Sequence, residues 1–337
     1  MKKASSVEIF GECLGIGVDV SKAELVVVGI TSEASYCKRV SNKMPAIKEF
    51  AQELRESGYR GWIVCESTGH YHLKLAVICQ QYDLQLVVLN PLQSSKHSKS
   101  GIRKTKTDPV DARLLATLCI TEPDLPKPAQ LTLDNALIRL TMGQLASLEK
   151  QLQQQQQSLA QYEETYAELG LEPSAPQQAL RAHCKALKRL QKQFGKELEA
   201  LLTQHPSDDE TVRNLRAIPG FSPLVSGLVG QFDRTVKGAD SWAAYVGLDV
   251  SVRESGTWKG RGKLTKRGNA YLRKRLFQAA WGACMNYEYV RAYYDQLKSQ
   301  GRKHVEAVCI IARKLLRIAY LMVKKGIRFD PGIAFAN

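Results

Sequence analysis

Four acidic residues stand at points in the sequence where a fold could bring them together. Asp19 ends the apolar run GIGVDV, and Glu66 ends a second apolar run, WIVCE. Asp108 and Asp111 open a helical pattern in KTDPVDARLLA, directly after a basic stretch. Clustered carboxylates make an oxygen-rich site for Mg²⁺ or Mn²⁺. Two such ions can hold the attacking and leaving oxygens of a phosphodiester in line.

Each of these acids also suits a structural role. Asp19 fits an Asx turn at a strand end, and Glu66 fits a cap for the helix that follows it. Asp108 before Pro109 fits a helix N-cap with proline at the first helical position, which puts Asp111 at the third. Two acidic strand ends favour a site, because sites gather at the carboxyl ends of strands. Acids three apart on a helix share a face and could point there.

Basic residues dominate the charge, with a net charge of +15 over 337 residues. This excess indicates a polyanionic partner, with nucleic acid first and a membrane surface second. The predicted nucleic-acid-binding residues of the loop 91–107 are Lys96, Lys99, Arg103, Lys104 and Lys106. Those of the second segment are Arg253, Lys259, Arg261, Lys263, Lys266, Arg267, Arg273, Lys274 and Arg275. Interleaved glycines there favour close approach to phosphates, and a solvated basic face is the alternative.

A serine in the second basic segment is a candidate nucleophile. Ser255 stands in RESG, between a basic residue and a glycine, where arginine could stabilise charge that develops on an attacked phosphate. Ser251 has a comparable setting, and a plain surface serine suits either position. His70 and His72 have no Cys or His partner at ligand spacing, so structural or exposed roles are expected for both.

The N-terminal part alternates strand and helix patterns. Three strands are predicted in LGIGVDVS, ELVVVGI and SYCKRVS, followed by the helix MPAIKEFAQELRESG. The strand GWIVCES, the helix YHLKLAVICQQYD and the strand LQLVVLN come next, and a helix resumes at Asp108. A meander followed by crossovers predicts an α/β layer. RNase H-type nucleases have this order, although periodicity alone does not select that fold over other α/β folds.

The remainder reads as helical. Proline-rich TEPDLPKPAQ predicts a boundary, and two long helical patterns joined by LEPSAP predict an antiparallel coiled-coil hairpin. A dimerisation or bridging role is favoured for the hairpin because a helix must bury its apolar stripe, and a spacer is the alternative. A helical third region includes the Ile-Pro-Gly turn of LRAIPGFSPLVSGLVGQF. The predicted domains are therefore residues 1–127, 128–205 and 206–337.

Composition narrows the class of protein. Eight scattered cysteines without a CxxC pair indicate buried free thiols in a reducing compartment rather than a zinc ribbon or a redox dithiol. A hydrophobic content of 44% is ordinary for a globular protein. The sequence shows neither a signal-peptide pattern nor an apolar run of about 18 residues. A cytoplasmic protein without a membrane partner is therefore expected.

Taken together, these motifs resemble the DEDD transposases of insertion-sequence family 110, which include related pilin-gene invertases. GVDVSK and CESTGHY are similar to the family's first two acidic motifs, and Asn90-Pro91 and KTDPVDARLLA resemble the segment with its last two acids. AIPGFSPLVS and WAAYVGLDVSVRESG, continuing to GRGKLTKRGNAYLRKRL, are similar to its C-terminal domain. One departure is that Asp249 and Val250 stand in the region where the family usually has a proline.

The resemblance implies a RuvC-like, RNase H-fold catalytic domain, a coiled-coil dimerisation region and a mainly helical transposase domain. It implies that Asp19, Glu66, Asp108 and Asp111 hold Mg²⁺ or Mn²⁺. Ser255 would be the nucleophile that forms a covalent phosphoserine link to DNA. The implied partners are donor and target double-stranded DNA and a structured noncoding guide RNA, termed a bridge RNA. Dimers would pair into a tetramer, and the active cytoplasmic protein would be associated with the bacterial nucleoid.

Three other functions stay open at this point. One is an RNA-independent, site-specific DNA invertase. Another is a junction-resolving nuclease that uses the four acids and water, without a covalent intermediate. The third is a DNA- or RNA-binding protein without enzymatic activity, in which the acids serve only as caps and turns.

Overall fold

The computed structural model covers the chain with short gaps, and its described part divides into two compact units, residues 1–140 and 141–337. The described residues are 6–67, 69–90, 107–123, 125–129, 131–204, 210–232, 236, 238–251, 254–255, 258–259 and 262–335. The boundaries of the three predicted domains stay a prediction. Each unit has its own packed interior.

The first unit is built on a five-stranded mixed sheet in the order β3-β2-β1-β4-β5. The strands are β1 (Gly15–Val20), β2 (Glu24–Ile30), β3 (Ser35–Ser41), β4 (Trp62–Glu66) and β5 (Gln85–Leu89). β1, β2 and β3 form an antiparallel meander, whereas β4 runs parallel to β1 and β5 runs parallel to β4. The five predicted strands and the mixed α/β class are confirmed. Assignment to the RNase H class stays a prediction.

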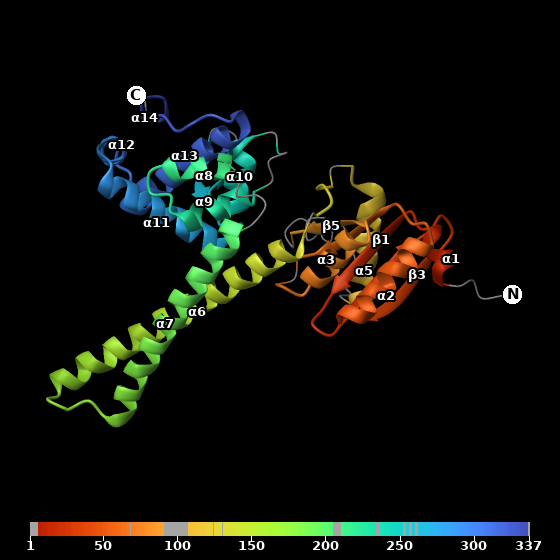
Figure 1. The fold of residues 1–337 in the computed structure, drawn as a ribbon, viewed down its shortest axis with the longest axis horizontal. Coiled ribbons are helices and arrows are strands. Elements are labelled where there is room, and N and C mark those ends of the chain that lie inside the picture. The colour runs from red at the N-terminus through yellow and green to blue at the C-terminus, as the bar shows by residue number, and fades with distance from the viewer. Residues whose placement is uncertain are drawn as a thin grey trace. The chain divides into compact units, whose positions relative to one another are not determined.

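Helices cover both faces of this sheet (Figure 1). They are α1 (Ser6–Gly11), α2 (Met44–Glu56), α3 (Leu73–Gln81) and α5 (Asp108–Thr121). Ile16, Val18 and Val20 of β1 belong to the large apolar core that includes α1, α2 and α3. α5 covers the opposite face, where Val26 and Ala112 belong to one buried cluster. Burial on both faces explains why β1, β2 and β4 read as nearly continuous apolar runs, whereas the edge strand β3 is mostly exposed and polar.

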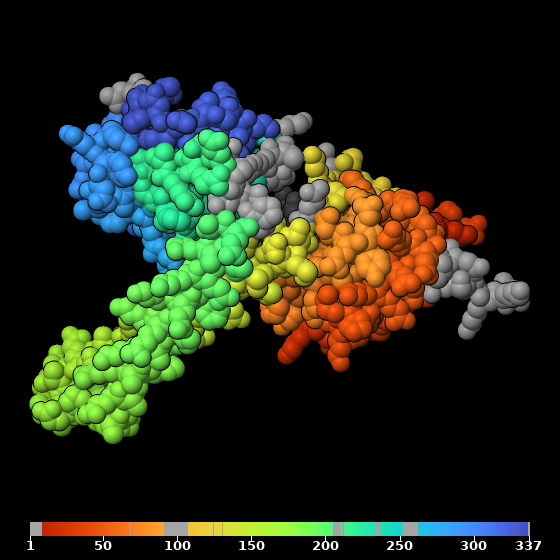
Figure 2. Space-filling view, in the orientation of Figure 1, coloured from red at the N-terminus to blue at the C-terminus, as the bar shows by residue number. Residues whose placement is uncertain are grey.

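The second unit begins within α6 (Leu133–Glu168), which pairs with α7 (Ala175–Gln204). The two helices lie side by side as an antiparallel hairpin (Figures 1 and 2). Their contact is a seam that includes Leu152, Leu159, Cys184 and Leu187. The predicted hairpin is confirmed, and it buries an apolar stripe within one chain. Dimerisation through this region stays a prediction, because the seam needs no second protomer.

Further helices and two-residue strands complete the described part of the second unit. The helical elements are α8 (Glu210–Asn214), the 3₁₀ turn η1 (Leu215–Ala217), α9 (Pro223–Gly230), α10 (Ala239–Val246), α11 (Ala270–Asn286), α12 (Glu288–Ser299), α13 (His304–Lys325) and α14 (Pro331–Ala334). Two-residue strands form the pairs β6 (Val250–Ser251) with β9 (Lys263–Leu264) and β7 (Glu254–Ser255) with β8 (Trp258–Lys259). The Ile-Pro-Gly turn packs on α11: a Cβ on Gly220 would lie 2.0 Å from the Ala279 carbonyl oxygen.

The described residues bear on two broader expectations, the absence of a membrane-spanning helix and the state of the cysteines. None of the helices there is long and apolar enough to cross a membrane. The eight cysteines are free thiols, and five of them are buried. Cys37 is exposed, because it lies on the edge strand β3. The prediction of buried free thiols is therefore confirmed for most of the cysteines and wrong for Cys37.

The closest backbone contact in the first unit yields a stability prediction. Gly17→Ala would place a Cβ 2.1 Å from the Ala112 carbonyl oxygen, which forces α5 away from β1. We expect a loss of about 2–3 kcal/mol in the free energy of unfolding, as for other overpacked cores. Urea denaturation measures it. Gly143→Ala, at a helical glycine with open space around it, should change stability by less than about 1 kcal/mol.

Candidate functional site

The strand β1 places Asp19 on the face covered by α5. Gly15, Gly17 and Asp19 alternate along β1 and therefore share that face. A Cβ on Gly15 would lie 2.5 Å from the Cβ of Cys119, and one on Gly17 would lie 2.2 Å from the Ala116 amide nitrogen. An advance of two residues along β1, from Gly15 to Gly17, thus corresponds to roughly one turn toward the N-terminus of α5. A further advance of two residues along β1, to Asp19, corresponds to the first turn of α5.

The strand β4 brings Glu66 to the same edge. It runs parallel to β1, with Gly17 opposite Val64 and Val18 opposite Cys65. The next pair in this register is Asp19 and Glu66. Residues side by side on parallel strands point to the same face of the sheet. Both acids are half-buried at the carboxyl ends of their strands, as the sequence predicts.

The helix α5 supplies the other two acids from its first turn. The sequence-based assignment of Asp108 as N-cap is wrong by one residue, because Thr107 has the extended backbone of the cap (φ −140°, ψ 148°). The Thr107 carbonyl accepts hydrogen bonds from the N–H groups of Val110 and Asp111 at 2.9 and 3.0 Å. Asp108 is instead an exposed first-turn residue, and Asp111 is half-buried. Both carboxylates also benefit from the positive end of the helix dipole.

Electrostatics show that the four acids converge. The pKa of Asp19 is raised from 3.8 to about 6, first by burial and then by the negative charges of Asp108, Asp111 and Glu66. A hydrogen bond from the Val20 backbone opposes the shift. Like charges raise a carboxyl pKa only when they lie near it. The structure therefore gathers residues that are up to 92 positions apart in the chain around Asp19.

The donor set suits a hard divalent cation, because it consists of carboxylate oxygens and their mutual repulsion is what a cation relieves. Within the described ranges, however, no three His, Cys, Asp or Glu side chains form a preassembled ligand group. The acids are thus electrostatic neighbours rather than a closed coordination shell. His70 is exposed and His72 is buried, and neither is part of such a group.

The predicted nucleic-acid-binding residues fall into three sets. Those outside the described residues are Lys96, Lys99, Arg103, Lys104, Lys106, Arg253 and Arg261, and Lys259 is described only by its backbone in β8. Lys263, Lys266 and Arg267 are exposed, as a phosphate contact requires. The third set, Arg273, Lys274 and Arg275, lies on α11 and makes contacts within the second unit.

These α11 cations have protein partners. The Arg273 guanidinium donates to the Val246 carbonyl at 2.8 Å. Lys274 lies 2.8 Å from a carboxylate oxygen of Glu149, and Arg275 pairs with the other oxygen. Glu149 is a buried acid on α6, and sequence reasoning missed it. The available signal was an acid on the apolar stripe of the predicted coiled coil, between Leu145 and Leu152.

The two candidate serines differ in what the structure describes. The Ser251 hydroxyl is exposed and donates to the Lys263 carbonyl at 3.1 Å. Ser255 lies in β7 opposite Trp258 of β8, and its side chain lies outside the described part. The backbone thus places Ser255 in a two-stranded antiparallel pair within the basic segment. The four acids belong to the first unit and Ser255 to the second.

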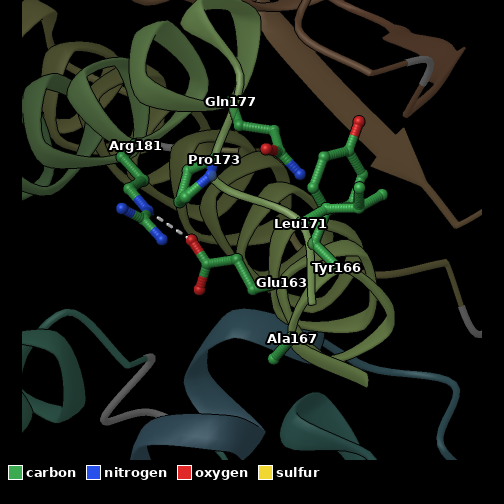
Figure 3. A pocket seen from close by; sticks show the side chains of 7 residues that line it. All are labelled: Glu163, Tyr166, Ala167, Leu171, Pro173, Gln177 and Arg181. Atoms are coloured by element: carbon green, nitrogen blue, oxygen red, sulfur yellow. Dashed lines mark hydrogen bonds and ion pairs between the residues drawn. The ribbon is translucent and has the colours of Figure 1, made fainter. Parts of the chain in front are cut away.

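A small pocket lies elsewhere, at the turn of the α6–α7 hairpin (Figure 3). Its lining consists of Glu163, Tyr166, Ala167, Leu171, Pro173, Gln177 and Arg181. Glu163 and Arg181 form an ion pair across it. None of the predicted site residues lines this pocket. It therefore has no part in the chemistry of the four acids.

Comparison with known proteins identifies the family. A DEDD transposase model of the IS110 type, described as a transposase, matches residues 16–169, and a model of the transposase IS116/IS110/IS902 family matches residues 212–295. The first range contains the four acids and the second contains Ser255. The chain belongs to the IS110 transposase family. The family resemblance predicted from the sequence motifs is thereby confirmed.

Individual relatives support this membership. The chain is 25% identical to the pilin gene-inverting protein of Moraxella lacunata over 94% of its own length and 98% of that protein. It is 29% identical to an uncharacterized 43.6 kDa protein of insertion element IS110 from Streptomyces coelicolor, over 40% of the chain and 33% of that protein. A probable family 20 transposase of Pseudomonas aeruginosa is 26% identical over 40% of the chain and 42% of its own length.

The raised pKa of Asp19 predicts how the stability of this IS110-family protein depends on pH. Because the folded chain holds the Asp19 proton more tightly than the unfolded chain, stability should fall as the pH rises from about 4 to about 6. Mg²⁺ or Mn²⁺ should raise the melting temperature more at pH 8, where the acids are charged, than at pH 5. Differential scanning calorimetry measures both effects.

Substitution of Asp19 tests whether the metal response depends on the clustered carboxylates. Asp19→Asn should raise the melting temperature of the metal-free protein at pH 8 and reduce its response to the cation. Asp295→Asn, at an exposed position on α12, should leave both quantities unchanged. An equal metal response in Asp19→Asn and the parent would contradict a cation site at these carboxylates.

The buried position of Glu149 on α6 predicts that its loss destabilises the fold more than the loss of a less buried acid on the same helix. Glu149→Gln leaves Lys274 and Arg275 without their acidic partner, and we expect a loss of about 2–4 kcal/mol in unfolding free energy. Glu163→Gln removes a half-buried partner of the exposed Arg181 and should cost less than about 1 kcal/mol. Equal, small losses in urea denaturation would show that the α11 cations do not depend on Glu149.

Proposed function

We propose that the protein is a metal-dependent DNA transposase that cuts and rejoins donor and target DNA. The observation that carries this proposal is the convergence of four carboxylates: burial first, and then the charges of Asp108, Asp111 and Glu66, raise the pKa of Asp19 to about 6. Asp19, Glu66, Asp108 and Asp111 hold Mg²⁺ or Mn²⁺ in this proposal. The bound cation supplies charge neutralisation and alignment of the phosphodiester oxygens. Membership in the IS110 transposase family supports the choice of DNA as substrate.

The carboxylates have distinct tasks on this proposal. Asp19 and Glu66 are fixed by neighbouring strands and give the site a rigid edge. Asp108 and Asp111 come from a helix start whose contact with β1 is set by the two glycines, so their distance from the sheet is also constrained. Rigid placement matters because in-line phosphoryl transfer depends mainly on positioning and charge stabilisation.

Ser255 is the nucleophile of the proposed reaction. Its hydroxyl oxygen attacks the phosphorus of a DNA phosphodiester and forms a phosphoserine ester. The bond to one deoxyribose oxygen breaks, and that oxygen takes up a proton as the serine gives up its own, so the strand is cut without loss of phosphoester energy. Rejoining is the reverse attack by a deoxyribose hydroxyl. The basic residues around β7 and β8 support this role by offering charge to a pentacoordinate phosphate.

A structured noncoding RNA and a defined assembly belong to the same proposal. The guide (bridge) RNA pairs with donor and target DNA, and dimers associate into a tetramer. Base pairing would then select the sequence, while the protein holds backbones through its basic residues. The resemblance of the motifs to the family supports this part. Exposed Lys263, Lys266 and Arg267 support backbone contacts by the second basic segment.

A site-specific DNA invertase is the second candidate. It is favoured by one observation, the match to the pilin gene-inverting protein of Moraxella lacunata over nearly the full length of both chains. An invertase of that kind would use the same acids and serine at fixed sites and would need no guide RNA. The two candidates differ in their nucleic-acid partners rather than in their phosphoryl-transfer chemistry.

The serine assignment predicts a covalent adduct. Full-length protein incubated with Mg²⁺, RNA transcribed from the flanks of its gene and labelled donor DNA should yield a protein–DNA band on a denaturing gel. Ser255→Ala should abolish that band and leave DNA binding intact. Ser251→Ala, whose hydroxyl bonds to the Lys263 carbonyl, is the matched control and should keep the adduct. An adduct that persists in Ser255→Ala would overturn the assignment.

Two further arms separate the candidates. Asp111→Asn should reduce strand exchange by at least about 100-fold if the acid holds the cation. RNase treatment should stop recombination by a guided transposase and should leave an invertase at its full rate. Cleavage without any adduct would instead favour a junction-resolving nuclease.

A further inference from the structure

The helix α7 carries a basic surface outside the segments already discussed. Six of its residues are exposed cations, namely Arg181, Lys185, Lys188, Arg189, Lys192 and Lys196. The chain has no acidic residue between Glu172 and Glu197. We call these six residues the α7 stripe. The dominance of one charge over a helix of 30 residues makes this surface distinct from an ordinary mixed helix face.

Helical geometry puts the six cations on one side. With about 100° per residue, their positions fall within an arc of roughly 100° along about four turns, so the stripe is about 22 Å long. Cys184, Leu187 and Leu198 are buried residues of α7, and they lie on a different side of the helix. The α7 stripe is therefore a continuous band on the face turned away from the apolar seam.

The neighbouring helix does not neutralise this band. Glu149 and Gln191 hydrogen-bond across the hairpin at 3.4 Å, and Glu163 pairs with Arg181, which fixes the antiparallel alignment. Between these two levels α6 carries the glutamine run 153–157 and no acid. Throughout this described hairpin, Arg181 alone among the stripe residues has an ion pair.

Like charges at this spacing oppose helix formation. The sequence contains four cation pairs four residues apart, Arg181–Lys185, Lys185–Arg189, Lys188–Lys192 and Lys192–Lys196. Such pairs destabilise a helix, whereas a solvent-facing helix usually gains from alternating acids and bases. A merely solvated face is therefore a poor account of the α7 stripe. A bound polyanion would turn this repulsion into attraction.

We infer that the α7 stripe docks on the phosphate backbone of duplex DNA, which rests on the proposed function as a DNA transposase. The band of Lys and Arg suits sequence-independent phosphate contacts. Single strands fit less well, because stacking platforms need exposed aromatic rings, and Phe194, the one Phe, Tyr or Trp within the stretch 181–196, is half-buried. The contact would hold DNA along the hairpin while chemistry takes place at the acids and Ser255.

A salt titration tests this inference on the full-length protein. The probe is a labelled DNA duplex of about 40 base pairs with arbitrary sequence, followed by fluorescence anisotropy. The slope of log K against log salt concentration is negative, and its magnitude grows with the number of phosphate contacts. The triple variant Lys185→Gln, Lys188→Gln and Lys192→Gln should reduce this magnitude by about 2–3, because three phosphate contacts are lost. The corresponding Lys→Arg triple keeps the charge and should retain the parent slope.

A dispersed triple is the matched control. Lys48→Gln, Lys298→Gln and Lys303→Gln removes the same charge from exposed positions on other elements and should change the slope by less than about 1. The stripe triple should also melt no lower than the parent, since it removes repulsion from α7. An unchanged DNA slope in the stripe triple overturns the inference.

Two outcomes separate this inference from the proposed function. In the first outcome the parent protein neither cuts DNA nor forms an adduct, yet the stripe triple has a shallower slope of log K against log salt concentration than the parent. That result contradicts the transposase proposal and leaves the stripe as a DNA surface. A parent that recombines DNA while the stripe triple keeps its slope contradicts the stripe alone. Loss of slope for an RNA duplex of the same length, with no loss for DNA, assigns the surface to RNA and overturns the inference as stated.

Discussion

The contact between α5 and β1 is the constraint on which the candidate site depends. Gly15 and Gly17 allow the backbone of the helix to lie directly against the strand, at distances where any Cβ would collide. A helix held further out by larger side chains would begin elsewhere relative to the end of β1. Because the contact fixes the helix along the strand as well as above it, the first turn of α5 is brought to the level of Asp19.

That placement makes the structural role and the proposed catalytic role of the acids compatible. The N-terminal end of α5 favours negative charge, so Asp108 and Asp111 stabilise the helix start. Burial raises the pKa of Asp19, and the same charges raise it further. A stabilising role at the start of the helix and the proposed catalytic role are therefore not mutually exclusive, although Thr107 rather than Asp108 is the N-cap. The acids repel one another at the sheet edge, while two of them stabilise the start of α5. The proposed cation would neutralise this negative charge.

The sequence predicted the parts of the fold that depend on local patterns. Apolar runs and helical periodicity located the strands, α5 and the hairpin, and acids at two strand ends pointed to the shared edge. The N-cap was placed one residue late, because Thr107 and Asp108 are both good capping residues and only backbone dihedrals separate them. Glu149 was missed because its partners, Lys274 and Arg275, lie 125 and 126 positions away, beyond the reach of any local pattern.

Basic residues in this chain divide according to the acids that face them. Arg275 belongs to a basic run in the sequence, yet its guanidinium forms an ion pair with the buried carboxylate of Glu149 on α6. The role of Arg275 in the fold follows from that contact. The α7 stripe is the reverse case. Its local sequence has no acid between Glu172 and Glu197, and α6 has none between Glu149 and Glu163, so that Arg181 alone in the stripe has an acidic partner, Glu163. A count of charges cannot make this distinction. The position of each cation relative to the nearest carboxylate decides whether its charge is used inside the fold or remains available to a phosphate.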